Sequence, residues 1–224
     1  MRCPSRLAGV RALLGVLLIV LVVGGQALAE TAPFAALTVT PAGPQRYDIT
    51  TGVTTLPQGG TVVDQDTGVT LKAASLQYVE GASIDAKDAS VTGSFGRLTA
   101  TSIHIDVAAA TLRASGDLQL VRDGLTVQAD ALRYDAGREV VDFTGPVTGA
   151  SPDFQADRVL LDARSGDVLL LGQYRFSEGA LTLTSPTGGG RLELHLHQAD
   201  GRPVYDAATE VSPALLARFS AELR

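Results

Sequence analysis

The stretch Gly116-Asp-Leu-Gln-Leu-Val-Arg-Asp-Gly-Leu-Thr-Val-Gln-Ala-Asp-Ala-Leu-Arg-Tyr-Asp135 contains two alternating runs of apolar and polar residues on either side of one turn. Successive side chains of a β-strand point to opposite faces, so each run predicts a strand that buries one face. Between them, Arg122-Asp-Gly124 has the composition of a tight hairpin turn. The stretch therefore predicts an antiparallel pair of half-buried strands.

The alternation changes phase at Asp130-Ala131, after which Leu132 and Tyr134 continue on the face occupied by Ala129. One extra residue is what a β-bulge or sharp corner inserts into a strand. A second turn is predicted over residues 135–139, after which the chain returns as another strand. Each unit therefore has the order strand, corner, strand, turn, strand.

The same pattern occurs three times, starting at Ala100, Ala129 and Ala156. In each copy a glycine follows the alanine by 16 positions, and the copies begin 29 and then 27 residues apart. The equivalent glycines are Gly116, Gly145 and Gly172, and the equivalent aspartates are Asp106, Asp135 and Asp162. Repetition at such a period is typical of stacked units that cannot bury their apolar faces alone. We expect a stack of antiparallel strands with no helix inside it.

Less regular alternation extends the predicted β region to residues 61–200. A degenerate copy starts near Leu71, and a later one spans Leu181 to Leu196. After it, Ser212-Pro213 begins a short apolar segment that predicts a helix from Pro213 to Leu223, which caps the open end of the stack or else remains a frayed tail. Residues 31–44 contain three prolines and are expected to be an irregular leader.

The N-terminus has the features of a secretory signal. Three arginines precede an apolar run from Ala12 to Gly25, which is shorter than the ~20 residues of a membrane-spanning helix. Ala27 and Ala29 are the small residues that signal cleavage needs, so we predict cleavage after Ala29; the alternative is an uncleaved membrane anchor. The predicted organisation is residues 1–29 signal peptide, 30–60 leader and first strands, 61–200 β-repeat domain and 201–224 C-terminal tail.

Composition limits the classes of partner and the sources of stability. The chain has 224 residues, and loss of residues 1–29 leaves 15 basic and 24 acidic residues, a net charge of −9. Such a charge argues against nucleic acid as a partner. No cysteine follows Cys3, so stability depends on buried area and not on disulfides.

The sequence contains no nucleophile–base pair, phosphate-binding loop or dinucleotide motif, so no catalytic residues and no cofactor are predicted. Glu193, His195 and His197 share one face of a predicted strand, but alternate leucines make this pattern typical of an ordinary half-buried strand, and no metal is predicted. The repeated aspartates lack neighbouring ligands for calcium, so we expect them to bond the backbone of their own turns.

The predicted inward-facing residues are the candidate site. If these side chains fill the space between them, they form an ordinary core; if they leave it open, they form a long apolar groove. The small residues among them favour a cavity: Ala100, Ala114, Ala129 and Ala156. The candidate groove residues are Ile103, Ile105, Leu118, Leu120, Leu125, Val127, Leu132, Tyr134, Val141, Phe143, Phe154, Val159, Leu161, Val168 and Leu170. Arginines on the strands, including Arg113 and Arg133, are either phosphate-neutralising groups at a rim or solvated surface charge.

The stretch quoted first resembles the repeat of the OstA-like (LptA/LptC) family of periplasmic lipopolysaccharide-transport proteins, and the similarity covers about residues 96–176. Residues 154–172 match well, although Leu161 replaces a tyrosine, and Thr101 replaces an aspartate in the weaker copy over residues 99–116. The resemblance implies an all-β, repetitive antiparallel open jelly roll, a V-shaped β stack whose apolar interior carries acyl chains.

The family resemblance also implies a function without catalysis. It predicts a periplasmic bridge protein that carries lipopolysaccharide or a related envelope lipid towards the outer membrane. The partners it implies are other OstA-like proteins, joined by edge-strand addition, and an end-to-end homo-oligomer. The alternative, from the residues themselves, is a structural or adhesive secreted β-repeat protein with a closed core.

Overall fold

The computed structural model describes residue 34, residues 36–200 and residues 202–224, which belong to one compact unit spanning residues 31–224. The predicted signal peptide and its cleavage site lie outside the described residues. In the part of the chain that is described, no helix has the length and apolarity needed to cross a bilayer.

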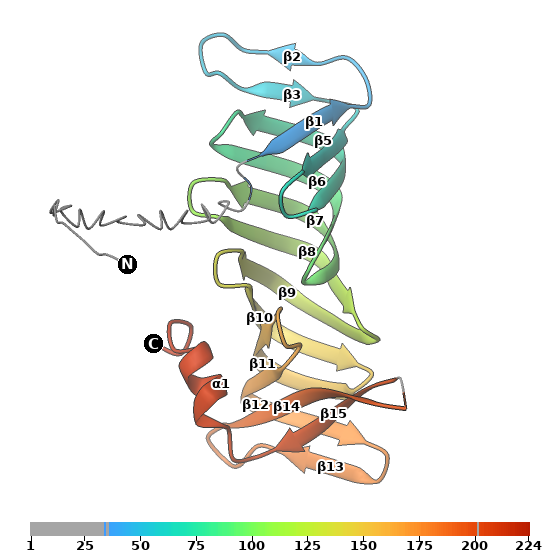
Figure 1. The fold of residues 1–224 in the computed structure, drawn as a ribbon, viewed down its shortest axis with the longest axis vertical. Coiled ribbons are helices and arrows are strands. Elements are labelled where there is room, and N and C mark those ends of the chain that lie inside the picture. Colours follow the sequence, from blue (N-terminus) through green and yellow to red (C-terminus); the bar gives the residue numbers. More distant parts are fainter. Residues whose placement is uncertain (1–33, 35, 201) are drawn as a thin grey trace, which may run out of the picture. The chain divides into compact units, whose positions relative to one another are not determined.

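The unit is built from fifteen strands that form one antiparallel sheet (Figure 1). From β4 to β12 each strand pairs with the next along the chain, so neighbouring hairpins stack in sequence order. The strands are β1 (Leu37–Pro41), β2 (Arg46–Tyr47), β3 (Thr54–Leu56), β4 (Gly60–Asp64), β5 (Thr70–Val79), β6 (Ser83–Gly93), β7 (Gly96–Asp106), β8 (Thr111–Arg122), β9 (Leu125–Asp135), β10 (Val140–Ala150), β11 (Asp153–Asp162), β12 (Val168–Glu178), β13 (Leu181–Thr184), β14 (Gly190–Ala199) and β15 (Arg202–Ala208). The predicted fold class, an antiparallel, unclosed all-β stack, is confirmed.

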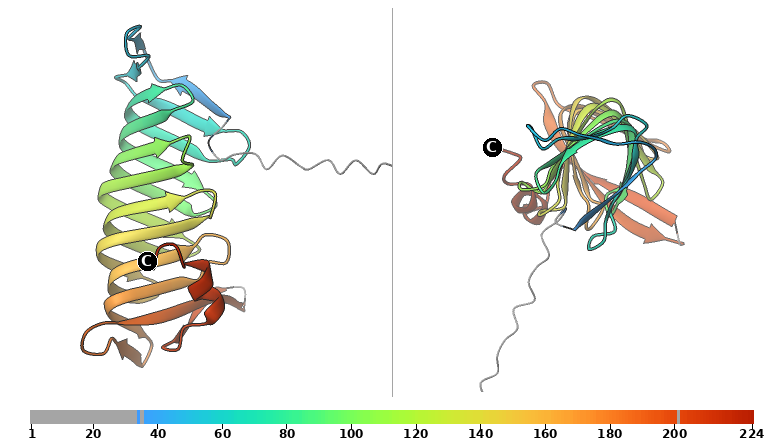
Figure 2. Two further views of the ribbon diagram at one scale, coloured as in Figure 1. Left: turned by 90° about the vertical axis from the view of Figure 1, so that its left-hand side faces the viewer. Right: turned by 90° about the horizontal axis from the view of Figure 1, so that it is seen from above.

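The long strands bend in the middle. Pairing registers shift between Ser115 and Leu118 in β8, and between Thr144 and Thr148 in β10. In β9 the buried residues change parity between Val127 and Leu132, at the predicted corner. The bends roll the sheet around a single interior, as the view from above in Figure 2 shows.

The repeated glycines lie at these corners. Gly145 and Gly172 adopt φ values of +88° and +81°, a region that favours glycine. A Cβ on Gly145 would lie 2.5 Å from Asp130 Oδ2 and one on Gly172 would lie 2.3 Å from Asp157 Oδ2. The Asp157 carboxylate also accepts a hydrogen bond from Gln173 N at 2.6 Å. Two of the three copies thus pair a glycine with a carboxylate on the neighbouring strand, where the bend disrupts regular pairing, and the first copy has Thr101 in place of the carboxylate.

The aspartates at the strand ends stabilise turns, as predicted. Asp106 Oδ1 accepts a hydrogen bond from Ala109 N at 2.9 Å, and Asp135 Oδ1 accepts one from Arg138 N at 3.0 Å. Asp162 Oδ1 likewise accepts one from Arg164 N at 2.9 Å. Each carboxylate therefore satisfies a backbone donor that its turn leaves unpaired.

Two expectations about the ends of the domain were wrong. The expected irregular leader contains β1, which pairs with β4 because Leu37 and Val39 alternate with threonines and pack against the core. Helix α1 (Pro213–Arg218) begins at the predicted cap, Ser212, whose Oγ accepts a hydrogen bond from Leu215 N at 3.3 Å. However, α1 does not cap the open end of the stack.

Instead, α1 covers the outer face of the sheet. Leu215 and Phe219 pack there against apolar residues of β10, β11 and β12. We call this cluster the outer core: Val140, Leu160, Leu169, Leu215 and Phe219. Apolar residues on the outer face explain this location, because strands covered on both faces contain continuous apolar runs.

Candidate lipid-binding groove

All fifteen candidate groove residues lie inside the rolled sheet, in one continuous apolar cluster. They come from six successive strands: Ile103 and Ile105 from β7; Leu118 and Leu120 from β8; Leu125, Val127, Leu132 and Tyr134 from β9; Val141 and Phe143 from β10; Phe154, Val159 and Leu161 from β11; Val168 and Leu170 from β12. None is more than 4% exposed, so their own side chains fill the interior.

Of the four small residues predicted to leave room, Ala100 and Ala156 line depressions at the bend, whereas Ala114 and Ala129 line neither of these two depressions. Ala73, Ala89 and Ala100 are neighbours on three successive strands and line a depression of about 780 Å³. Asp88 and Asp117 lie at the same depression. A second depression, of about 680 Å³, includes Ala156 further along the stack. The hollows are bordered by exposed residues, and the interior that the small residues were predicted to leave open is packed, so the predicted cavity is absent from the described structure.

The two ends of the bent strands meet along a line that we call the seam. Phe95 is in the β6–β7 turn, at one end of the strands, and Tyr134 is near the other end of β9. Their ring centroids are 4.6 Å apart with an interplanar angle of 52°, a stabilising tilted arrangement. Burial raises the pKa of the Tyr134 hydroxyl. Side chains therefore close the seam here, and the described strands make no backbone ladder across it.

Phe34 also lies at the seam. Its ring is 1% exposed, and its backbone N–H donates to Asp64 Oδ2 at 2.9 Å. A gap of about 230 Å³ lies between Phe34, Val69 and Tyr134. Burial would raise the pKa of Asp64, but hydrogen bonds from Thr67, Phe34 and Asp66 together lower it. A charged carboxylate therefore holds Phe34 against the core.

Other apolar and aromatic side chains lie along the seam towards both ends of the stack. Near the first strands, Leu37, Val39 and Tyr78 line a gap of about 230 Å³. Near the last strands, Tyr205 of β15 is 5% exposed, and burial raises its pKa to about 12. The interior is thus bounded by separate side-chain contacts along its length.

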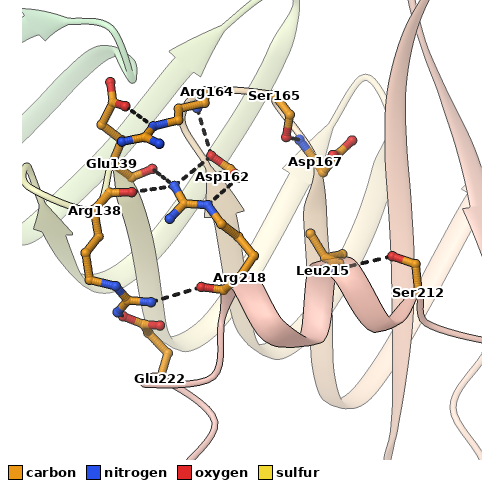
Figure 3. Close-up of polar contacts among 10 residues, drawn as sticks. All are labelled: Arg138, Glu139, Asp162, Arg164, Ser165, Asp167, Ser212, Leu215, Arg218 and Glu222. Carbon is orange, nitrogen blue, oxygen red and sulfur yellow. Dashed lines mark hydrogen bonds and ion pairs between the residues drawn. The ribbon is translucent and has the colours of Figure 1, made fainter.

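Ionic contacts hold α1 on the outer core (Figure 3). Arg218 donates to both Asp162 oxygens, with Nε–Oδ2 and Nη2–Oδ1 distances of 2.6 and 3.0 Å. Arg138 Nη2 donates to Arg218 O at 2.9 Å, and Arg138 also pairs with Glu222. Burial would raise the pKa of Asp162, but hydrogen bonds from Arg218, Arg164 and Ser165 and the charge of Arg218 together lower it.

The residues considered for metal binding have other partners. Glu193 accepts hydrogen bonds from Ser212 N at 2.6 Å and Ser212 Oγ at 3.0 Å, which fixes the start of α1. His195 Nδ1 lies 2.7 Å from Asp167 Oδ1, and His197 lies beside Asp206. In the described ranges no cluster of three or more His, Cys, Asp or Glu residues is placed to hold a metal ion.

Sequence reasoning identified Tyr134 as inward-facing and predicted the helix that contains Leu215, but it missed Phe95 at the seam and the strand residues of the outer core. Phe95 lies in a four-residue turn and carries no periodic signal. Leu160 and Leu169 did carry a sequence signal. They lie in the continuous apolar runs Val159-Leu-Leu161 and Val168-Leu-Leu-Leu171, which predict burial on both faces of the sheet. The carboxylate of Asp64 resembles the turn aspartates, but its bond to Phe34 depends on a residue 30 positions away.

These features define a class of protein: a stack of bent antiparallel strands, rolled around an apolar interior and unclosed at a seam of side chains. No family model matches the chain, and no curated protein matches it. Among solved structures it is similar to LptH of Pseudomonas aeruginosa, described as the LptA-homologous periplasmic component of the conserved lipopolysaccharide transport device. The two chains are 14% identical with a TM-score of 0.44, and the match covers 50% of this chain and 86% of LptH.

Proposed function

We propose that this protein carries an envelope lipid, such as lipopolysaccharide, through the periplasm with the acyl chains held inside the rolled sheet. The observation that supports this proposal is an apolar interior contributed by six successive strands and bounded by a seam of side-chain contacts. The OstA-like repeat over residues 96–176 and the predicted signal sequence support the lipid and the location. This function requires no catalytic residue.

A comparison of free energies favours opening at the seam. Backbone ladders hold neighbouring strands together, whereas at the seam the rings of Phe95 and Tyr134 meet. Burial of one such ring contributes about 2–3 kcal/mol, whereas transfer of a chain of about twelve methylenes out of water contributes about 10 kcal/mol. A guest chain can therefore offset the separation of about four such rings at the seam.

Photo-crosslinking tests this proposal. A benzophenone amino acid at Phe143, which points inward, is compared with one at Gln128, an exposed residue of the neighbouring strand β9. We expect lipid adducts in the cell envelope from position 143 and none from position 128. Adducts absent from 143 and from a second interior position, Leu170, support the competing function, a secreted scaffold with a closed core, which the filled interior favours.

We further propose that copies of this protein, or related β stacks, join through edge strands. Among the described strands, β1 pairs only with β4 at one end of the stack, and β13 pairs only with β12 towards the other. A strand with one unpaired edge can accept a strand of another molecule. Such pairing places successive apolar interiors in line.

A further inference from the structure

The outer face of the sheet carries one unusual pair of charges, Arg113 on β8 and Arg133 on β9. The pairing register places these residues directly opposite each other, and both side chains are exposed. Among the registers of the described strands, this is the single position at which two like charges face each other. Like charges placed in this way destabilise a sheet, so the pair needs an explanation.

The neighbouring acidic residues do not neutralise this pair. Asp142 is the register partner of Arg133 on β10, but both its oxygens accept hydrogen bonds from Arg158, at 2.8 Å each. These hydrogen bonds, which Arg158 donates to Asp142, raise the pKa of Arg158. On the other side, Asp85 bonds His104 Nδ1 at 2.8 Å. In the described structure, neither Arg113 nor Arg133 has a carboxylate oxygen within 4.0 Å of a guanidinium nitrogen.

The two arginines border a depression of about 350 Å³. Its other lining residues include the hydroxyl groups of Ser102, Ser115 and Thr144, which lie in the adjacent cross-strand row with Ala131. Lys87 adds a further cation near this row, since its Nζ donates to Ser102 Oγ at 3.2 Å. Small residues and hydroxyl groups thus line this depression together with Arg113 and Arg133.

We propose that this depression binds a phosphate group, in which Arg113 and Arg133 act as paired donors to its oxygens. Guanidinium groups match the geometry of phosphate oxygens, and a phosphate monoester carries nearly two negative charges at neutral pH, enough to neutralise both arginines. Arg113 and Arg133 come from neighbouring strands, so their side chains start about 5 Å apart and can converge on one group. The phosphate comes either free in solution or from a lipid headgroup.

Thermal unfolding with and without inorganic phosphate, at matched ionic strength, tests this site. We expect phosphate to raise the Tm of the parent protein, and the affinity to fall about tenfold for each arginine removed in R113Q and R133Q. The matched control is the double variant R97Q/R175Q, because these exposed arginines face only neutral residues in their registers. The variant R113E separates binding from folding, since its carboxylate pairs with Arg133 and should keep the Tm at or above that of the parent while phosphate binding is lost.

Vesicles distinguish the two sources of phosphate. Phosphatidylcholine vesicles containing phosphatidic acid, a lipid phosphate monoester, are compared with vesicles of phosphatidylcholine alone. Binding that requires phosphatidic acid and both arginines assigns the site to a headgroup; binding of inorganic phosphate alone assigns it to the free ion. The proposal is overturned if neither source binds, or if R113Q/R133Q binds as well as the parent. The site lies outside the sheet, so this result is independent of lipid crosslinking at Phe143.

Discussion

Gly145 illustrates how a single residue fixes the corner of a strand. Its φ of +88° is a strained conformation for any residue with a side chain, and the Asp130 side chain occupies the space that a Cβ would need. The glycine and the carboxylate are both part of the repeat, so the same chemistry recurs at Gly172 and Asp157. Bending therefore involves a local glycine–carboxylate pair in these two units, whereas Gly116 of the first copy lies beside Thr101.

We expect Gly145→Ala to lower the free energy of unfolding by about 2 kcal/mol, from backbone strain and the contact with Asp130. Urea unfolding followed by circular dichroism measures the loss. Gly137→Ala is the control, because its Cβ would meet only Asp135 Oδ1 at 3.6 Å, an ordinary contact. Equal stabilities of the two variants would contradict a special role for the corner glycine.

The Asp162 carboxylate couples the stability of α1 to pH. Its pKa is lower in the folded protein than its ordinary value, because hydrogen bonds and the charge of Arg218 outweigh the effect of burial. The stabilisation is therefore present above the unfolded pKa of Asp162, near 4, and is lost as the pH falls through the lower folded pKa.

We predict that Asp162→Asn lowers the Tm at neutral pH, and that the difference from the parent shrinks steadily below about pH 4. Asparagine can still accept the hydrogen bond from Arg164 N, so the turn is preserved. Differential scanning fluorimetry across acidic pH values measures the effect. A difference in Tm that is constant across this range would contradict the assigned role of the Asp162 charge.

At the scale of elements, the strands and α1 differ in what stabilises them. The strands are recognisable from alternation because one face of each is buried in the interior. Helix α1 has only six residues, too few for stability in isolation, so its stability depends on the outer core and on its ionic contacts. Correct prediction of its cap therefore did not reveal its location.

Leu215→Ala should weaken this docking by about 2–3 kcal/mol, since Leu215 is buried in the outer core. Leu216→Ala is the matched control, because the adjacent leucine is only partly buried and lies outside that cluster. Hydrogen exchange measured by mass spectrometry should show faster exchange over residues 213–219 in the first variant and no change over β7 to β9. Faster exchange throughout the sheet would instead show that α1 supports the whole fold.

At the scale of the whole molecule, the ends of the stack determine what it can assemble with. Leu181 on the edge strand β13 is 47% exposed, and Val121, inside the stack on β8, is 41% exposed. The two residues are therefore well matched in exposure and differ in their access to an unpaired strand edge.

We expect end-to-end association to weaken about tenfold in Leu181→Lys, because a lysine on an edge strand opposes pairing, and to be unchanged in Val121→Lys. Sedimentation velocity over a range of protein concentrations measures the association. Comparable Tm values for both variants show that the fold is retained. A parent protein that stays monomeric, or equal association of the two variants, argues against assembly through β13.

The sequence by itself determined the alternating strands, the corner at Asp130, the turn carboxylates and fifteen of the residues inside the sheet. These features depend on interactions within a few residues or on the two-residue period of a strand, so they can be read without knowledge of distant contacts. Gly145 and Asp135 are both examples, because each acts within its own repeat unit.

Only the tertiary structure decided which distant groups meet. Phe95 reaches Tyr134 because the strands bend enough for their opposite ends to approach, and Arg113 faces Arg133 because of the β8–β9 register. Leu160 and Leu169 pack against Leu215 of α1, which follows them in the chain by some 50 residues. The physical reason is that these contacts depend on accumulated bending and pairing over the whole sheet, which no local pattern of residues encodes.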